Sequence, residues 1–363
     1  MIATAGARGF TLLEALVGSA ISLVVVGLSC RLAADAQSAW RSSAARVDLH
    51  QRARVAADLV PRLFREAGAG PLSGPARAAG ASGVVLMRGL PPVLPRRIGR
   101  RGGDAVDVFR PDAVSVVRAV AESEHGVLLV GTPAGATVLE LAPRTGCLLP
   151  ACGFEAGTAA MLLDASGRFD IFTVTSVAGM VLTVRHHGPN PSSAYAAGTA
   201  VVAVDFTSLA LDPASRTLRA YDGDASDLPL LDDVVGMEVR YWGEPEPPAW
   251  PRPPGGEENC LYAADGSYRA ALMPALGPAG RLVELTAALL TDGPWCGSGD
   301  TQFDADLLRV RLVRVRLRFQ ASDAAVRGRG AGFVHPGAAT RAALLVPDRT
   351  VSIDVTPRHM RSE

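Results

Sequence analysis

One carboxylate lies inside the most apolar stretch of the sequence. Residues 10–30 have the sequence FTLLEALVGSAISLVVVGLSC, in which Glu14 is the only charged residue. A carboxylate at bilayer depth costs on the order of 2.5–3.5 kcal/mol on insertion scales. Because a single substitution would remove this cost, we expect Glu14 to have a function. The chemistry available to it is pairing with a cation in apolar surroundings.

The five cysteines form a second group of reactive residues. Cys30 ends the apolar stretch, and the others follow as the pairs Cys147 with Cys152 and Cys260 with Cys296. No C-x-x-C or His-x(3–5)-His spacing accompanies them, which argues against a zinc site. In an oxidising compartment we expect the two pairs to form disulfides, with Cys30 free or bonded to another subunit. In a reducing compartment the cysteines would be buried free thiols.

An acidic stretch has part of the spacing of a calcium-binding loop. Its oxygen-bearing residues occupy the first, third, fifth and twelfth places of such a loop: Asp222, Asp224, Ser226 and Asp233. However, Asp227 stands where the loop needs a glycine, and Pro229 interrupts it. We therefore expect a solvated acidic turn and no resident metal.

No combination of residues indicates an enzyme. The chain has no lysine, and no Walker loop, HExxH or GxGxxG motif. Ser298 lies in CGSGD, outside a G-x-S-x-G frame. His186 and His187 are neighbours on an expected strand, so their side chains face opposite ways and cannot chelate one ion together. We expect neither enzymatic activity nor a cofactor.

A long N-terminal helix must position Glu14 and Cys30. At about 1.5 Å per residue, residues 10–30 extend roughly 30 Å, the thickness of a bilayer's hydrocarbon core. Spacings of three and four continue beyond them, which predicts a helix that packs on its own domain. The predicted packing face is Trp40, Ala44, Val47, Gln51, Val55, Leu59 and Leu63. Pro61 predicts a kink or break, and Gly68 suits the left-handed position after a helix.

The remaining chain consists of short apolar runs separated by Gly, Pro, Asp and Ser, which is typical of an antiparallel sheet protein. The expected strands are residues 84–87, 105–109, 114–120, 127–130, 137–141, 160–163, 169–177, 180–186, 200–206, 217–221, 234–242 and 307–319. The last strand changes phase near Leu312 and Val313, which predicts a bulge, and its arginines predict a solvated face. Residues 244–258 predict a loop or linker, and residues 282–290 a short helix.

The segment Arg8-Gly9-Phe10-Thr11-Leu12-Leu13-Glu14 resembles the processing signal of type IV pilins and type II secretion pseudopilins. In that family a short leader ends in Gly, the next residue is usually Phe, and Glu is fifth in the mature chain. The resemblance implies that prepilin peptidase cleaves between Gly9 and Phe10 and methylates the new amine of Phe10. It also implies that Glu14 pairs with the amine of a neighbouring subunit during assembly.

Two other interpretations of the N-terminus remain open. A cleaved secretory signal would use the A-x-A site at residues 34–36, although the apolar stretch is longer than such signals require. A plain signal anchor would remain uncut. Neither interpretation explains Glu14. Further along, LFREAGAG and two C-terminal segments resemble PilW-like and GspJ-like minor subunits.

The resemblance implies an α+β fold, in which a long N-terminal helix with a membrane-spanning first half packs on a large antiparallel β-rich globular head. The implied divisions are a leader (1–9), a transmembrane part (10–30), a periplasmic part of the helix (31–68) and the head (69–363). The N-terminus would be cytoplasmic, at the bacterial inner membrane, and the head periplasmic, before assembly into a pilus or pseudopilus.

The implied function is that of a minor pilin or pseudopilin that helps to initiate or cap a filament. The implied partners are prepilin peptidase, other pilin or pseudopilin subunits, the inner-membrane assembly platform and the lipid bilayer. The alternative is a membrane-anchored, adhesin-like or DNA-capturing domain exported by the same route. The net charge of +0 gives the chain no overall positive electrostatic field that would attract polyanions, and we expect no nucleic-acid partner.

Overall fold

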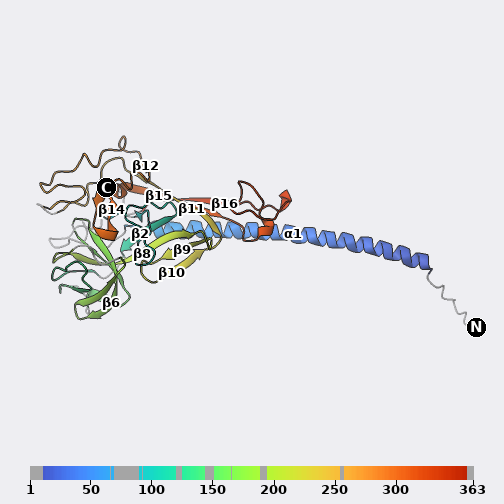
Figure 1. Ribbon diagram of the computed structural model, residues 1–363, viewed down its shortest axis with the longest axis horizontal. Helices are drawn as coiled ribbons and strands as arrows, with labels where there is room; N and C mark the ends of the chain where they lie inside the picture. Colours follow the sequence, from blue (N-terminus) through green and yellow to red (C-terminus); the bar gives the residue numbers. More distant parts are fainter. Residues whose placement is uncertain are drawn as a thin grey trace, which may run out of the picture. The chain divides into compact units, whose positions relative to one another are not determined.

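The computed structural model describes residues 11–65, 67–68, 90–91, 93–119, 125–143, 151–164, 166–188, 194–253 and 257–357. These residues form one long N-terminal helix followed by antiparallel sheets, which confirms the predicted α+β class (Figure 1). The chain divides into two compact units, residues 1–51 with 320–349 and residues 52–319 with 350–363. The expected strand at residues 84–87 lies outside the described residues, as do Gly9, Phe10 and Cys147.

The helix α1 (Leu12–Arg65) contains 54 residues and continues through Pro61, so the break that we expected as the alternative to a kink does not occur. Pro61 is the fifth residue from the end of the helix, where it removes one helical hydrogen bond, and it is buried together with Phe64. Packing of this turn in the second unit offsets the lost bond. Gly68 has a φ of 69°, as expected after a helix, and its N–H donates to the carbonyl of Val117 (2.9 Å).

The predicted packing face of α1 is also wrong. The buried positions are Ser42, Leu49, Ala53, Ala56, Val60 and Phe64. Of the predicted face, Trp40, Val47 and Val55 are 73%, 57% and 52% exposed. At 3.6 residues per turn the two sets lie on opposite sides of the helix. Spacing alone could not distinguish them, because both sets repeat every three or four residues. The buried set also includes the small residues Ala53 and Ala56, which mark a packed face less clearly than large apolar side chains do.

The larger sheet has ten strands: β1 (Val93–Leu94), β2 (Ala113–Ala119), β3 (His125–Val127), β4 (Val138–Glu140), β5 (Ala159–Leu163), β6 (Phe169–Ala178), β7 (Val181–His186), β8 (Ala200–Asp212), β9 (Thr217–Tyr221) and β10 (Asp227–Leu231). Its main path runs β1-β2-β8-β5-β6-β7-β4. The central strand β8 is long enough to pair with β3 and β5 along its first half and with β2 and β9 along its second. Every pairing is antiparallel.

The second sheet has the order β12-β11-β15-β16, formed by β11 (Val234–Gly243), β12 (Val283–Leu285), β15 (Val310–Phe319) and β16 (Arg349–Val355). A separate pair joins β13 (Trp295–Cys296) to β14 (Phe303–Asp304). Gly243 lies opposite Val310 and Trp242 opposite Leu312, so Arg311 is the extra residue. This bulge confirms the predicted change of phase, one position earlier than expected, and it allows both Val310 and Val313 to be buried.

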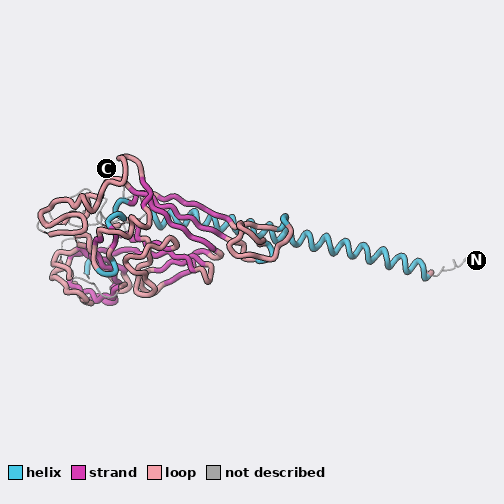
Figure 2. The backbone as a smooth tube through the Cα atoms, turned by 45° about the horizontal axis from the view of Figure 1, so that its top comes forward, coloured by secondary structure: helices cyan, strands magenta, loops and turns pink. Residues whose placement is uncertain are grey.

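Two other element predictions are wrong. Residues 105–109 contain a turn at 106–107 and no strand, and residues 282–290 form β12 followed by a turn, not a helix. Much of the head is loop, drawn pink in Figure 2. Residues 244–253 and 257–258 contain no helix or strand. The fully buried Arg309 anchors this segment, because its guanidinium donates to the carbonyls of Pro245 (2.6 Å) and Pro274 (2.8 Å) and pairs with Asp306.

Candidate functional site on the N-terminal helix

Glu14 caps the start of α1. Its Oε2 accepts hydrogen bonds from the Thr11 N–H (3.0 Å) and the Thr11 hydroxyl (2.9 Å), while the Glu14 N–H donates to Thr11 Oγ1 (3.3 Å). This is a capping box, whose S/T-x-x-E pattern is visible as Thr11-Leu12-Leu13-Glu14 but was missed in the sequence. Glu14 therefore has a local structural partner in addition to any charge it meets in an assembly.

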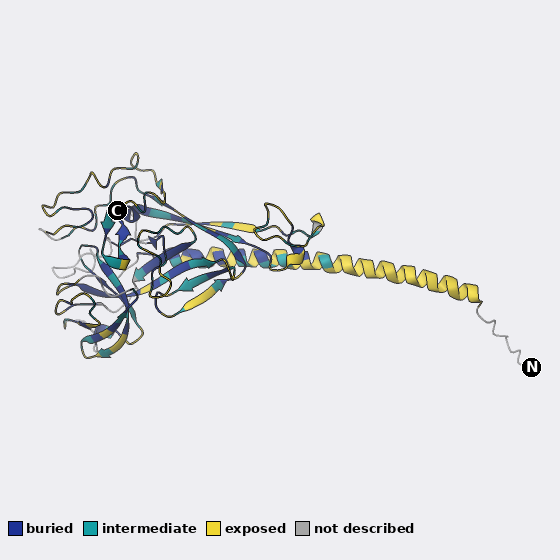
Figure 3. Ribbon diagram, in the orientation of Figure 1, coloured by how far each residue is buried: buried dark blue, intermediate teal, exposed yellow. Residues whose placement is uncertain are grey.

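The first half of α1 is an apolar cylinder with no protein around it. Among the described residues, one helix, α1, is long enough and apolar enough to span a membrane. None of its most apolar 18-residue window is buried (Figure 3). Its serine hydroxyls are satisfied within the helix: Ser19 donates to the carbonyl of Leu16, and Ser22 and Ser29 donate to carbonyls four residues back. Internal satisfaction of polar groups is what a helix in lipid requires.

The apolar surface does not end where a membrane would. The exposed Trp40, Val47 and Val55 continue it well past Cys30, on the side of α1 opposite the buried positions. Val47 lies 17 residues beyond Cys30, which is about 25 Å at 1.5 Å per residue. We call Trp40, Ala44, Val47, Gln51 and Val55 the open stripe.

The cysteines follow the predicted pattern where the structure describes them. Cys260 and Cys296 form a disulfide with a Cα–Cα distance of 4.9 Å, and Cys30 is free and exposed. Cys152 is disulfide-bonded, while its expected partner Cys147 lies outside the described residues. The Cys260–Cys296 bridge ties the loop after β11 to β13.

The candidate calcium ligands are not brought together. Asp222 Oδ1 accepts three backbone N–H groups of its own turn. Asp224 pairs with Arg185 and accepts a hydrogen bond from the Thr173 hydroxyl (3.1 Å). Asp233 pairs with Arg52 and Arg216. Each carboxylate thus has its own partners, and the three do not form a common coordination sphere.

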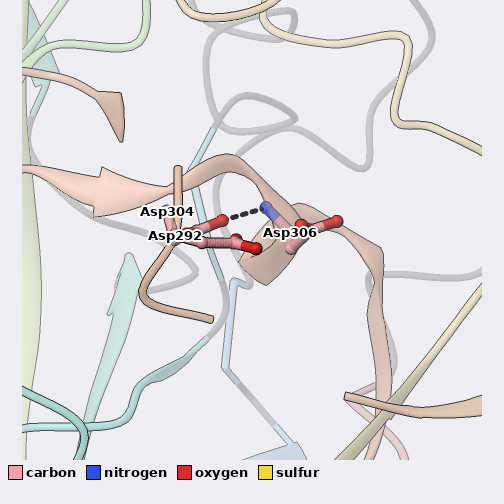
Figure 4. A group of neighbouring side chains, drawn as sticks. All are labelled: Asp292, Asp304 and Asp306. Atoms are coloured by element: carbon pink, nitrogen blue, oxygen red, sulfur yellow. Dashed lines mark hydrogen bonds between the residues drawn. The ribbon is translucent and has the colours of Figure 1, made fainter. Parts of the chain in front are cut away.

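A different acidic cluster was not recognised from the sequence. Carboxylate oxygens of Asp292, Asp304 and Asp306 lie within 4.8 Å of one another (Figure 4). Asp304 accepts the N–H groups of Gly293 (2.6 Å) and Asp306 (2.9 Å), and Asp306 pairs with the guanidinium of Arg309 (2.5 Å). The clustering of Asp within the DGPWCGSGDTQFDAD segment was the available signal.

Burial dominates the electrostatics of this cluster. It raises the pKa of Asp304 to about 7, against the lowering effect of the two backbone N–H donors. The pKa of Asp306 is also raised by burial, although Arg309 acts in the opposite direction. Oxygen ligands of this kind could hold a hard cation such as calcium. In the present geometry, hydrogen bonds and Arg309 already engage both buried carboxyl groups.

The two histidines, His186 at the end of β7 and His187 directly after it, lie in separate environments, as expected for neighbours in an extended chain. The His186 ring packs edge-on against Phe172, and its Nε2 lies 2.8 Å from the Ala136 carbonyl. The His187 ring packs against Phe206, and its Nε2 lies 2.8 Å from Thr173 Oγ1. Burial lowers the pKa of both residues, that of His187 to about 4. Both residues border a cavity of about 350 Å³ together with the 97–105 loop.

No known family and no curated protein matches this chain. The architecture therefore stands on its own geometry, a long apolar N-terminal helix followed by a β-rich head.

Proposed function

We propose that the chain is a minor pilin or pseudopilin, a structural subunit of a type IV pilus or type II secretion pseudopilus. Residues 10–30 insert in the inner membrane, prepilin peptidase cleaves after Gly9 and methylates Phe10, and α1 then joins the subunit to its neighbours. The observation that carries the proposal is the two-sided helix. From Ser42 onward one face of α1 is buried in its own chain, while the exposed Trp40, Val47 and Val55 on the opposite face extend the apolar surface that begins at Leu12.

The open stripe separates this function from that of a plain anchor. An anchor needs an apolar surface only across the roughly 30 Å of lipid. Val47 and Val55 lie beyond that thickness, and the chain's own fold does not cover them. Burying a side chain such as Val gains about 1.5–3 kcal/mol, so a neighbouring helix along this stripe would be stabilising. A helical subunit in a filament supplies such a neighbour.

The arginines of β15 support a structural role over the capture of nucleic acid. Arg314 pairs with Asp354 (2.6 Å), Arg316 with Glu238 (3.1 Å), and Arg311 with Glu244 (2.7 Å). Each of these cations is matched by a carboxylate within its own sheet or its connections. A surface that binds the phosphates of nucleic acid needs a net positive charge.

Cleavage is the first test. After co-expression with a prepilin peptidase, we expect the intact mass of a chain that begins at N-methyl-Phe10, with 363 − 9 = 354 residues. A Gly9→Val variant serves as the uncut control. A chain that begins at Gln37 would identify a secretory signal instead, and an uncut chain with active peptidase present would contradict the proposal.

Assembly is the second test. Val47→Asp places a charge on the open stripe, so we expect at least a tenfold loss of pili or secretion in a complemented deletion strain. Ala57→Asp is the matched control, because it adds the same charge to an exposed position of the same helix that is not three or four residues from any member of the stripe. Equal activity of the two variants would show that the stripe is not an assembly surface.

A further inference from the structure

The connection between β15 and β16 forms a clasp on α1. We define the clasp as residues 320–349, which belong to the same compact unit as residues 1–51 and are drawn in orange and red beside the blue helix in Figure 1. The side-chain contacts that join it to the helix include those of Arg341 with Asp35, Arg46 with the carbonyl of Leu345, and Arg349 with His50. The clasp therefore follows one side of α1 from Asp35 to His50.

The clasp has a defined internal structure. The Gln320 side chain is fully buried, donates to the His335 carbonyl (3.2 Å) and to Asp348 Oδ1 (2.9 Å), and accepts from Arg327 (2.7 Å). A Cβ at Gly337 would collide with the carbonyl of Ala324, so the chain crosses itself closely there. These contacts fix the position at which Arg341 meets the helix.

The end of the clasp lies near the boundary of the apolar segment. Asp35 follows Cys30 by five residues, which is about 7.5 Å at 1.5 Å per residue. The polar headgroup layer adds roughly 5–8 Å on each side of the hydrocarbon core. If residues 10–30 span the membrane, as the proposed function requires, Asp35 and Arg341 lie at the level of the headgroups.

The charges at this level favour a phosphate. Arg31 precedes Asp35 by one helical turn, is exposed, and has no ion-pair partner among the described residues. The Arg341 side chain is 70% exposed, and its Nη1 lies 3.0 Å from Asp35 Oδ1. Two guanidinium groups therefore flank one carboxylate and leave a net positive charge. The guanidinium donors match the oxygens of a phosphate in geometry and charge.

We propose that Arg31 and Arg341 together bind the phosphate of an anionic lipid headgroup beside Asp35, whose single charge offsets only one of the two guanidinium groups. The inference rests on the proposed function in one respect, the insertion of residues 10–30 in the membrane. The clasp thereby becomes a second membrane contact, which fixes the depth and rotation of α1 before the subunit is extracted into a filament.

The native Cys30 provides the probe for a test. It is exposed, free, and directly precedes Arg31, so a thiol-reactive fluorophore placed there reports the lipids around that residue. The full chain is reconstituted in phosphatidylcholine vesicles that contain doxyl-labelled phosphatidylglycerol or doxyl-labelled phosphatidylcholine as quencher. We expect phosphatidylglycerol to quench more strongly, corresponding to a severalfold preference. Arg31→Gln and Arg341→Gln should each reduce the preference about fivefold, the value for one basic residue near an anionic surface.

Two further variants separate this site from a purely structural clasp. Arg41→Gln removes an exposed arginine about 15 Å further along α1 and should leave the preference unchanged. Asp35→Asn breaks the ion pair but keeps both guanidinium groups, so we expect the preference to be retained or increased. A loss in Asp35→Asn equal to that in Arg341→Gln would show that the pair only fastens the clasp, and would overturn the proposal.

Other outcomes are equally decisive. Alkaline carbonate extraction of the vesicles tests the membrane segment separately, and release of the chain would count against the proposed function itself. Stable insertion with equal quenching by both lipids would overturn only the headgroup site. If millimolar inorganic phosphate abolishes the preference while the lipids remain, the site binds phosphate without selecting a lipid, and the proposal is wrong.

Discussion

Glu14 meets two demands that the sequence alone did not separate. Its carboxylate completes a capping box with Thr11, and its charge is available to the amine that cleavage would create at Phe10. Either demand could preserve a carboxylate in an apolar segment. The two demands differ in what they require: a cap needs an acceptor at residue 14 and a hydroxyl at residue 11, whereas an ion pair needs only the negative charge.

Substitutions at the two positions therefore separate the roles. If assembly depends on the charge, Glu14→Gln should abolish filament assembly while it keeps the acceptor of the capping box, and Thr11→Ala should assemble nearly normally at a cost of about 1 kcal/mol in helix stability. Pilus or secretion assays in a complemented deletion strain measure the outcome, with immunoblots to verify equal expression. Normal assembly of Glu14→Gln together with failure of Thr11→Ala would assign Glu14 to the cap alone.

At the scale of elements, the sequence predicted what local periodicity can specify. The helix, most strands of the larger sheet and the bulge in β15 followed from apolar spacing, because a strand that must bury Val310 and Val313 needs one extra residue between them. The side on which α1 is buried did not follow, since Trp40 and Val47 form as regular a stripe as Leu49 and Ala53. The same limit applied to β12, whose partner β11 is distant in the chain.

The loop after β11 depends on a covalent tie, because it has little regular structure. The Cys260–Cys296 bridge closes a loop of 36 residues. On the chain-entropy model we expect the double variant Cys260→Ser/Cys296→Ser to lose about 3–4 kcal/mol of unfolding free energy. Urea unfolding of the full chain in detergent micelles measures this loss. Cys30→Ser is the control and should leave the unfolding free energy unchanged, because Cys30 is exposed and unbonded. A similar loss in the control and in the double variant would show that the disulfide is not the cause.

At the scale of the whole molecule, the candidate sites are of two kinds: those formed by consecutive residues and those formed by segments that are distant in the sequence. The proposed processing motif and the cap lie within seven consecutive residues, so both can be read from the sequence. The carboxyl cluster of Asp292, Asp304 and Asp306 and the clasp on α1 arise from long connections that return to earlier parts of the chain. Burial of Asp304 also depends on its neighbours in space, and no spacing rule indicates it.

Asp304 and His187 are buried groups that contribute to the pH dependence of stability with opposite signs. The pKa of Asp304 is raised to about 7 in the folded chain from an ordinary value near 3.8, so its stabilising contribution is complete below pH 3.8 and is lost as the pH rises to 7. The pKa of His187 is lowered to about 4 from 6.5, so its contribution is present above pH 6.5 and is lost as the pH falls to 4.

Paired variants should reveal these opposite slopes. Relative to the unchanged chain, Asp304→Asn should be most destabilised at pH 4 and recover as the pH rises to 7, by up to about 1.4 kcal/mol per pH unit. His187→Gln should show the reverse, with its stability relative to the unchanged chain improving as the pH falls from 6.5 to 4. Urea unfolding at half-unit pH steps measures both differences. Because both variants are compared with the same chain, titration of the other groups cancels, and parallel pH curves for all three proteins would contradict the assignment of these pKa shifts to burial.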